Sequence, residues 1–558
     1  MFSDPIVTFA FLAEKRPFLR TTPWMEDLVG LATFLGVVGY VVCLTREAIA
    51  DRDRLREVLE ATTCPPPERL KRIASKGDVL TKDLSLQGRT MASGDCIPDM
   101  RIHELESLGT VFPSANVSNE KRRGVMQGDT AGCKSRHIGY NKIIGTSDYI
   151  VSDIVRKEGD QTGSECWVRA GPRGTIHFEP SNVNAAVVTC GGLCPGLNNV
   201  VRELVHALYY LYGVNSVLGV VGGYNGFNGD YAPIPLTPAL VATCHHEGGS
   251  ILASSRGGFD LDKIIAFLQE RDIQQLFIIG GDGTHRGAFA ISQEVIKRGL
   301  NIAVAGIPKT IDNDVDLIDR SFGFQTSVEA AQAAIRSAKT EAKCNLPNGI
   351  GIVKLMGRSA GFIAAHATLA SGDVDLCLVP EVPIELHGPN GYLEFLLSRV
   401  KKQGHAVVVV AEGAGEELLG ESVEVDAGGN RKLPRIGEFL KSEVEKSFQA
   451  NNLTATVKYI DPSYMIRSVP ANASDSLYCM MLAQNAVHGT MAGYTAFTTG
   501  LVNNRVAYIP IPRLVSTSPR VMDPNGRTWE RVRAMTRQPQ VARYIDTSGI
   551  NVACKSVV

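Results

Sequence analysis

Short apolar runs recur along this chain beyond residue 184, and longer segments with helical periodicity separate them. The runs cover residues 185–188, 217–221, 276–279, 302–305, 349–353 and 406–410. Nearly continuous apolar strands that alternate with helices are typical of a parallel sheet covered by helices on both faces. The pattern therefore predicts an α/β, doubly wound fold whose ligands bind at the carboxyl ends of the strands.

Composition narrows the classes of protein that this chain can belong to. A length of 558 residues is enough for about two or three domain cores. Lysine and arginine (57) nearly balance aspartate and glutamate (58), which argues against a protein that coats nucleic acid. The twelve cysteines form no C-x-x-C pair, so we expect no zinc site, and we expect Cys190 and Cys194 to be structural thiols.

Two loops that follow apolar runs combine glycines with carboxylates. Residues 280–284 (GGDGT) open a helical segment, so their backbone N–H groups can cradle phosphate oxygens. Residues 308–314 (PKTIDND) supply Asp312 and Asp314. Phosphoryl transfer needs a carboxylate that anchors a metal beside the phosphates, and a second group that takes the proton of the acceptor. The two loops together offer both groups.

Three further segments accompany these loops: VVTCGGLCPGLN (187–198), KLMGRSAG (354–361) and DPSYMIR (461–467). In this order the five segments resemble the ATP-dependent 6-phosphofructokinases of plants and trypanosomatid protists, over residues 165–512. The resemblance implies phosphorylation of fructose 6-phosphate at its 1-hydroxyl by ATP with Mg²⁺. The product would be fructose 1,6-bisphosphate, and the reaction would be the committing step of glycolysis.

The resemblance also implies two doubly wound lobes with the active site between them. The nucleotide-binding lobe would span residues 141–323 and be completed by about 466–514. The sugar-phosphate-binding lobe would span residues 324–465 and be completed by about 515–558. Residues 1–140 would form a divergent N-terminal extension.

On the nucleotide side, the resemblance implies a phosphate contact for each of several loop residues and a metal contact for Asp282. These residues are Gly191, Arg256, Gly257, Asp282, Gly283, Thr284 and Lys309. Two of them conflict over the donor. Relatives that use pyrophosphate tend to carry aspartate where Gly283 stands, which favours ATP, but they also carry the lysine found here as Lys309. We give the steric argument at Gly283 more weight.

On the sugar side, Asp312 resembles the family's proton acceptor, and Thr310 and Arg358 are the other expected catalytic residues. The expected substrate contacts are Thr310, Ile311, Asp312, Met356, Gly357, Arg358, Glu412, Lys458, Tyr464, Met465, Ile466 and Arg467. Bacterial relatives carry arginines where Gly349 and Lys458 stand here, and one of these arginines crosses a subunit boundary. The subunit-crossing contacts are therefore left open.

The N-terminal extension contains an apolar stretch, residues 28–44, followed by several arginines. The stretch is just short of a comfortable membrane span, so a membrane or targeting segment and a soluble helix are both open. We expect a cytoplasmic protein, with a plastid-targeted or membrane-anchored one as the alternative. The family resemblance implies an allosteric homo-oligomer, a tetramer.

Three rival functions are weighed against the ATP-dependent enzyme. A pyrophosphate-dependent phosphofructokinase is favoured by Lys309. A lipid or NAD kinase would explain GGDGT but leaves PKTIDND, MGR and the Tyr464–Arg467 segment unexplained. A non-catalytic regulatory subunit conflicts with the presence of both Asp282 and Asp312.

Overall fold

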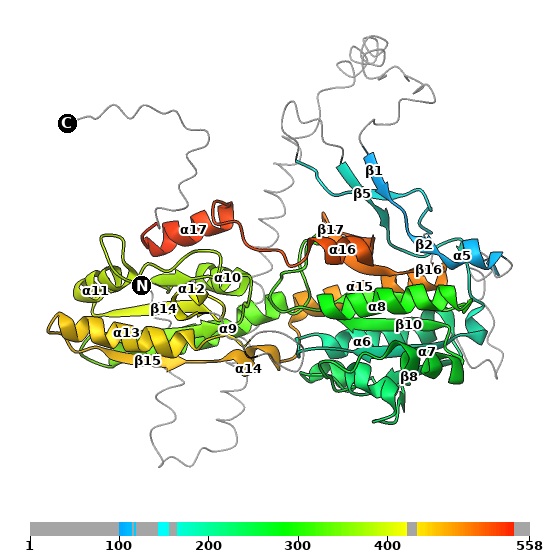
Figure 1. The fold of residues 1–558 in the computed structure, drawn as a ribbon, viewed down its shortest axis with the longest axis horizontal. Coiled ribbons are helices and arrows are strands. Elements are labelled where there is room, and N and C mark those ends of the chain that lie inside the picture. Colours follow the sequence, from blue (N-terminus) through cyan, green and yellow to red (C-terminus); the bar gives the residue numbers. More distant parts are fainter. Residues whose placement is uncertain are drawn as a thin grey trace, which may run out of the picture. The chain divides into compact units, whose positions relative to one another are not determined.

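Two sheets, both built around parallel strands, form the framework of this computed structural model (Figure 1). The structure describes residues 100–113, 117–118, 143–155, 164–420, 424 and 432–540, and all of these belong to one unit that spans residues 97–558. Residues 28–44, for which a membrane or targeting segment and a soluble helix are both open, lie outside the described residues. In the part of the chain that is described, no helix has the length and apolar character needed to cross a bilayer.

The larger sheet has ten strands. Its parallel centre consists, in order, of β8 (Ser216–Val220), β7 (Asn184–Thr189), β10 (Gln275–Gly280), β11 (Ala303–Pro308) and β17 (Phe497–Val502). The flanks are β9 (Ile234–Pro235) at one edge and β18 (Arg505–Pro510), β5 (Ser164–Arg169), β1 (Met100–His103) and β4 (Tyr149–Val151) at the other. β1 lies within the expected N-terminal extension, yet it pairs with β5, so this part of the chain belongs to the sheet.

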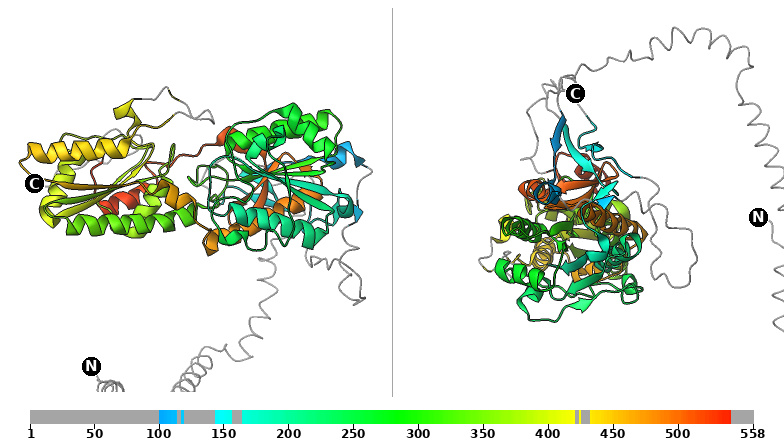
Figure 2. Two further views of the ribbon diagram at one scale, coloured as in Figure 1. Left: turned by 90° about the horizontal axis from the view of Figure 1, so that it is seen from below. Right: turned by 90° about the vertical axis from the view of Figure 1, so that its right-hand side faces the viewer.

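Alternate residues of the central strands enter two different cores. Val187 of β7 packs with helices α6 (Leu197–His206) and α15 (Ala473–Met491), whereas Val188 packs with α7 (Leu261–Glu270) and α8 (Asp282–Lys297). Figure 2 shows these helices on opposite faces of the sheet. Both faces are thus buried, which explains why the strands are apolar at successive positions.

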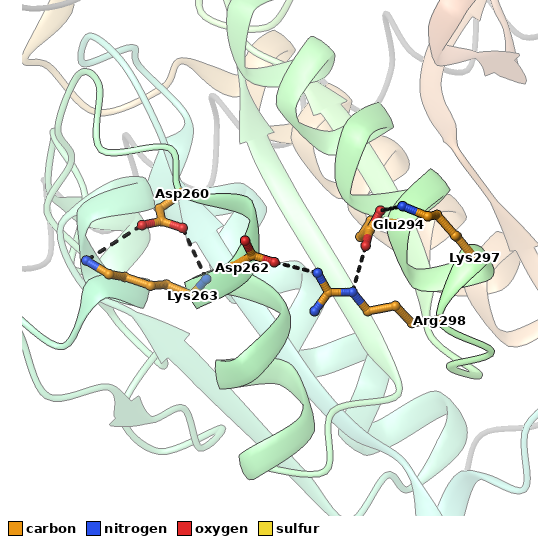
Figure 3. A network of polar contacts seen from close by, with 6 residues as sticks. All are labelled: Asp260, Asp262, Lys263, Glu294, Lys297 and Arg298. Carbon is orange, nitrogen blue, oxygen red and sulfur yellow. Dashed lines mark hydrogen bonds and ion pairs between the residues drawn. The ribbon is translucent and has the colours of Figure 1, made fainter.

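A polar network on the protein surface links α7 to α8 (Figure 3). The Arg298 guanidinium lies 2.5 Å from Asp262 of α7 and 2.7 Å from Glu294 of α8. Exposed ion pairs of this kind contribute at most about 1 kcal/mol each. Apolar burial against the sheet, rather than this network, therefore fixes the helix that begins at Asp282.

The smaller sheet has four parallel strands in the order β13 (Leu376–Leu378), β14 (His405–Ala411), β12 (Gly349–Leu355) and β15 (Thr456–Ile460). Helix α9 (Phe324–Cys344) covers one face, where it packs against α10 (Phe362–Ser371), and α13 (Ile436–Ala450) covers the other (Figure 2). The chain passes from the larger sheet to the smaller one and returns to add β17 and β18. After β18 the helix α17 (Arg527–Thr536) packs against α10. The predicted doubly wound α/β fold is confirmed; the domain boundaries stay a prediction.

Candidate active site

The turn after β7 is surrounded by positive charge. Gly191 has a φ of +83°, a conformation that glycine adopts readily. The Lys309 ammonium donates to the carbonyl of Gly192 at 2.7 Å. A Cβ added at Gly192 would lie 3.9 Å from Nη2 of Arg256 and 4.0 Å from Nη1 of Arg467. Three cations from separate segments therefore converge on this turn, as an anionic ligand requires.

Helix α8 begins directly after β10, and no side chain caps its first N–H groups in the described structure. Unpaired N–H groups at a helix N-terminus attract anions. Gly283 lies in this first turn, and a Cβ added to it would meet no described atom within 4 Å. Thr284 faces inward under Gly280, and its carbonyl accepts a hydrogen bond from the Tyr224 hydroxyl at 2.8 Å. The start of α8 is thus fixed in place while its glycine faces open space.

Asp282 is the first residue of α8, and its pKa is raised to about 6. Partial burial is the main cause and the negative charge of Asp314 adds to it, while Arg286 acts in the opposite direction. A carboxylate whose pKa is raised by a neighbouring negative charge is suited to share a cation with that neighbour. No group of three or more His, Cys, Asp and Glu side chains that could hold a metal occurs among the described residues. One or two carboxylates together with substrate phosphates is the usual arrangement around Mg²⁺.

The loop after β11 carries two of the three expected catalytic residues, Thr310 and Asp312. The Thr310 hydroxyl donates to Asp314 at 2.7 Å and accepts from the backbone N–H of Asp312 at 3.1 Å. Oδ1 of Asp312 is buried and has no hydrogen-bond partner in the described structure. Burial, followed by the charges of Asp314 and Glu412, raises the pKa of Asp312 to about 8. An acidic group with this pKa can gain and lose a proton near neutral pH.

The smaller sheet contributes a third loop that meets Asp312. The backbone N–H of Arg358 hydrogen-bonds to the Asp312 carboxylate, and both this bond and the arginine's charge lower the pKa of Asp312. Gly357 has a φ of +133°, and a Cβ there would lie 2.5 Å from the carbonyl oxygen of Ala360. Only glycine fits this turn without a shift of the backbone. The segment after β12 therefore brings Arg358 to the carboxylate of the other sheet.

Glu412 follows β14, and its N–H donates to the Leu355 carbonyl at 2.9 Å. Burial raises the pKa of Glu412, and Lys354, Arg358 and Arg467 oppose this shift. Lys354 also forms an ion pair of 2.6 Å with Asp461. Lys354 and Asp461 are charged residues that our sequence analysis missed, although both stand in segments that it quoted.

Helix α14 (Ser463–Arg467) presents two of the expected sugar contacts at the surface. Tyr464 and Met465 are 74% and 73% exposed, and the Arg467 guanidinium lies 4.8 Å from the centre of the Tyr464 ring. The same guanidinium lies near the turn of Gly192, where an added Cβ would be 4.0 Å from its Nη1. Lys458 is exposed on β15, and no contact in the described structure joins it to the other site residues.

The remaining expected residues differ in what their side chains can reach. Ile311 and Ile466 are buried in the core, so any ligand contact falls to their backbones. Met356 packs at the edge of the same core, whereas Arg256 and Gly257 are exposed. The sequence motifs identified the loop on which each of these residues lies, but not the direction in which its side chain points.

A family model described as phosphofructokinase matches residues 184–503, which include every loop of this site. The chain belongs to the phosphofructokinase family. This confirms the family that the five sequence segments predicted.

Individual phosphofructokinases agree with this assignment. ATP-dependent 6-phosphofructokinase 7 of Arabidopsis thaliana is 52% identical over 71% of this chain and 81% of its own length. ATP-dependent 6-phosphofructokinase of Trypanosoma brucei brucei is 45% identical over 66% of this chain and 75% of its own. The crystal structure of pyrophosphate-dependent phosphofructokinase from Marinobacter aquaeolei has a TM-score of 0.53 at 20% identity, with 64% of this chain and 92% of that chain covered. This last likeness shows the fold alone.

Proposed function

We propose that this chain is an ATP-dependent 6-phosphofructokinase, which converts fructose 6-phosphate and ATP into fructose 1,6-bisphosphate and ADP at the committing step of glycolysis. The observation that carries the proposal is the position of Asp312. Its carboxylate bonds to the Arg358 loop of the smaller sheet and lies in the same loop as Asp314, which acts on Asp282 at the start of α8. A proton acceptor thus stands beside a phosphate-binding helix terminus.

Gly283 supports ATP as the phosphoryl donor. The space around its added Cβ leaves room for the α-phosphate, which an aspartate at this position would obstruct. Lys309 is the feature that favours pyrophosphate, and it is buried against the Gly192 carbonyl. A lysine there supplies positive charge to either donor, whereas an aspartate side chain would exclude one of them. The steric observation therefore decides for ATP.

The residues divide the work of phosphoryl transfer between the two sides of the site. Gly191, Arg256, Gly257, Thr284 and the N-terminus of α8 bind the phosphates of the nucleotide, and Asp282 with Asp314 would hold Mg²⁺. When bound, Mg²⁺ neutralises charge on the phosphate oxygens. The carboxylate oxygens present fit this ion, because Mg²⁺ prefers hard oxygen ligands in small number.

On the acceptor side, Asp312 takes the proton of the 1-hydroxyl as the phosphoryl group arrives, and Thr310 orients the loop. Arg358 stabilises the charge that develops during transfer. Glu412 accepts hydrogen bonds from sugar hydroxyls, and Met356 and Gly357 line the sugar. Arg467 and Tyr464, with the rest of the segment 461–467, bind the 6-phosphate. An Arg–phosphate pair provides geometry as well as charge.

Steady-state kinetics with each donor tests the proposal. We expect kcat/KM for ATP to exceed that for pyrophosphate by more than about tenfold, which corresponds to about 1.4 kcal/mol. Faster turnover with pyrophosphate would establish the pyrophosphate-dependent enzyme. Phosphorylation of a lipid or of NAD without turnover of fructose 6-phosphate would indicate the second rival, and no turnover with any acceptor would indicate a regulatory subunit.

The Lys354–Asp461 pair leads to a prediction about pH. Lys354 favours the ionised form of Glu412, so Lys354→Met raises the pKa of Glu412 further above its usual range. As the pH is lowered, Glu412 in this variant takes up its proton at a higher pH than in the wild type. The rise in KM for fructose 6-phosphate that follows from this protonation therefore also begins at a higher pH. Measuring this KM across about pH 5 to 8 checks the result. Lys354→Arg keeps the charge and serves as the control; identical pH profiles for Lys354→Met and the wild type would contradict the assigned role.

We further propose a cytoplasmic homo-oligomer, a tetramer by analogy with the family, and allosteric control by small molecules. The exposed side chains of Tyr464 and Met465 beside Arg467 support a neighbouring subunit at this edge of the sugar site. Light scattering of the purified protein measures the assembly. Fractionation of cells distinguishes the cytoplasm from a plastid or a membrane contact through residues 28–44.

A further inference from the structure

A short segment near the C-terminus, residues 518–522, joins the two halves of the fold. It follows α16 (Ile511–Thr517), which packs beside the larger sheet, and precedes α17, which packs beside the smaller one (Figure 1). We call residues 518–522 the crossing segment. None of its residues belongs to the sequence segments that identified the active site.

The crossing segment holds the loop that carries the catalytic aspartates. The backbone N–H of Arg520 donates to the carbonyl of Asp314 at 2.6 Å, and its guanidinium donates to the carbonyl of Asn313 at 3.1 Å. A further guanidinium bond reaches the carbonyl of Ile318 at 3.2 Å. The Ser518 hydroxyl accepts the N–H of Asp316 at 3.2 Å. Residues 313–318 of the loop are thus held through their backbone by the crossing segment.

The loop needs such ties because its backbone is unfavourable by itself. Asn313 and Leu317 have φ values of +58° and +65°, which place both in the left-handed region. A leucine in this region carries a cost of order 1–3 kcal/mol and persists only where surrounding contacts impose it. The contacts of Arg520 span both of these positions, so they are well placed to impose the conformation.

The other end of the crossing segment is fastened beside Arg358. The backbone N–H of Met522 donates to Glu381 at 2.8 Å, and the same carboxylate oxygen accepts the N–H of Gly361 at 2.9 Å. Gly361 is the N-cap of α10, and the Arg520 guanidinium lies 5.0 Å from the ring centre of Phe362, the first residue of that helix. Arg520 therefore contacts both the Asp312 loop and the helix that follows the Arg358 turn.

We propose that Arg520 is a positioning residue for phosphoryl transfer, which fixes the Asp312–Asp314 loop relative to the Arg358 turn by binding the backbone of one and the helix of the other. The inference rests on the proposed function. The Arg520 guanidinium acts through the carbonyls of Asn313 and Ile318. Its burial lowers the pKa of Arg520, and the charges of the nearby Asp316, Asp314 and Asp319 oppose this shift. Loss of its side chain should misplace Asp312 while the phosphate-binding turns after β7 and β10 stay in place.

Steady-state kinetics of Arg520→Met and Arg520→Lys tests the inference. We expect Arg520→Met to lower kcat by about 10²-fold, because misplacement by about 1 Å costs this much. KM for ATP should stay within about threefold of wild type, since the backbone N–H of Arg520 still holds the Asp314 carbonyl in this variant. Arg520→Lys should recover part of the lost kcat, because an ammonium can still donate to one of the two carbonyls.

Two further variants separate positioning from a loss of stability. Arg271→Met removes an arginine that stacks on Phe267 at 4.9 Å, away from this loop, and should leave kcat unchanged. Glu381→Leu releases both Met522 and Gly361 without touching the aspartate loop, and should lower kcat by about tenfold. If Arg520→Met does not fold, kcat of Glu381→Leu tests whether the crossing segment positions the aspartate loop.

If the wild-type enzyme is active and Arg520→Met keeps the full kcat, the inference is overturned and the proposed function stays intact. An equal loss in Arg520→Lys and Arg520→Met would also overturn it, as would unchanged kcat in Glu381→Leu. Inactive wild-type protein with ATP and fructose 6-phosphate would overturn the proposed function and the inference together.

Discussion

Replacing Asp312 with asparagine should lower kcat by about 10²- to 10⁴-fold, the range that general-base catalysis typically supplies. Asparagine has almost the same shape and can still accept the hydrogen bond from the Arg358 backbone N–H, so the loop should keep its conformation. KM for fructose 6-phosphate should therefore change little. Steady-state kinetics measures both constants, and turnover within about twofold of wild type would mean that Asp312 only orients the hydroxyl.

The raised pKa of Asp312 gives this prediction a pH dependence. In the wild type, kcat/KM for fructose 6-phosphate should rise with pH up to about 8, because the carboxyl must lose its proton to act as a base. This rise should be absent in the residual activity of Asp312→Asn.

The same shift affects folding. A carboxyl whose pKa is raised from 3.8 to about 8 by burial stabilises the fold fully below the lower value, and this contribution is lost as pH rises toward the higher one. In Asp312→Asn this pH-dependent loss of folding stability is absent, so the variant should become more stable than the wild type as the pH rises through this window. Denaturant unfolding at the two ends of the window measures the change.

Gly283→Asp should abolish the use of ATP, with a fall in kcat/KM of at least about 10²-fold, because an added carboxylate both fills the open space and repels phosphate. The substitution should not harm folding. Gly283 is exposed in the first turn of α8, where aspartate favours the helix and glycine does not. Kinetics with ATP and with pyrophosphate measures the effect.

Gly283→Ala is the matched control for this variant. It adds only a Cβ, which meets no described atom within 4 Å, so kcat/KM for ATP should stay close to that of wild type. If Gly283→Asp used ATP as well as Gly283→Ala does, the steric account of donor choice would be wrong.

The sequence predicted the strands of this fold because their signal is local. The runs at 276–279 and 302–305 lie within or overlap β10 and β11, since a strand buried on both faces must be apolar at successive positions. Once these strands are predicted, the loops that follow them can be predicted to bind ligands, because ligands bind at the carboxyl ends of parallel strands.

Features that depend on distant pairing were not predictable in this way. The partner of Lys354 is Asp461, which follows the neighbouring strand β15, and the partners of Arg520 lie in a loop about two hundred residues earlier. The sequence around Lys354 or Arg520 does not predict which residue each of them contacts. The burial of Ile466 between the exposed Met465 and the stacked Arg467 likewise follows from packing in three dimensions.

A crystal structure with a non-hydrolysable ATP analogue, Mg²⁺ and fructose 6-phosphate tests the central claim most directly. We expect the γ-phosphate at the start of α8 beside Asp282, and the 1-hydroxyl of the sugar within about 3 Å of the Asp312 carboxylate. A sugar bound with its 1-hydroxyl away from Asp312, or a nucleotide bound away from Asp282 and Gly283, would contradict the account.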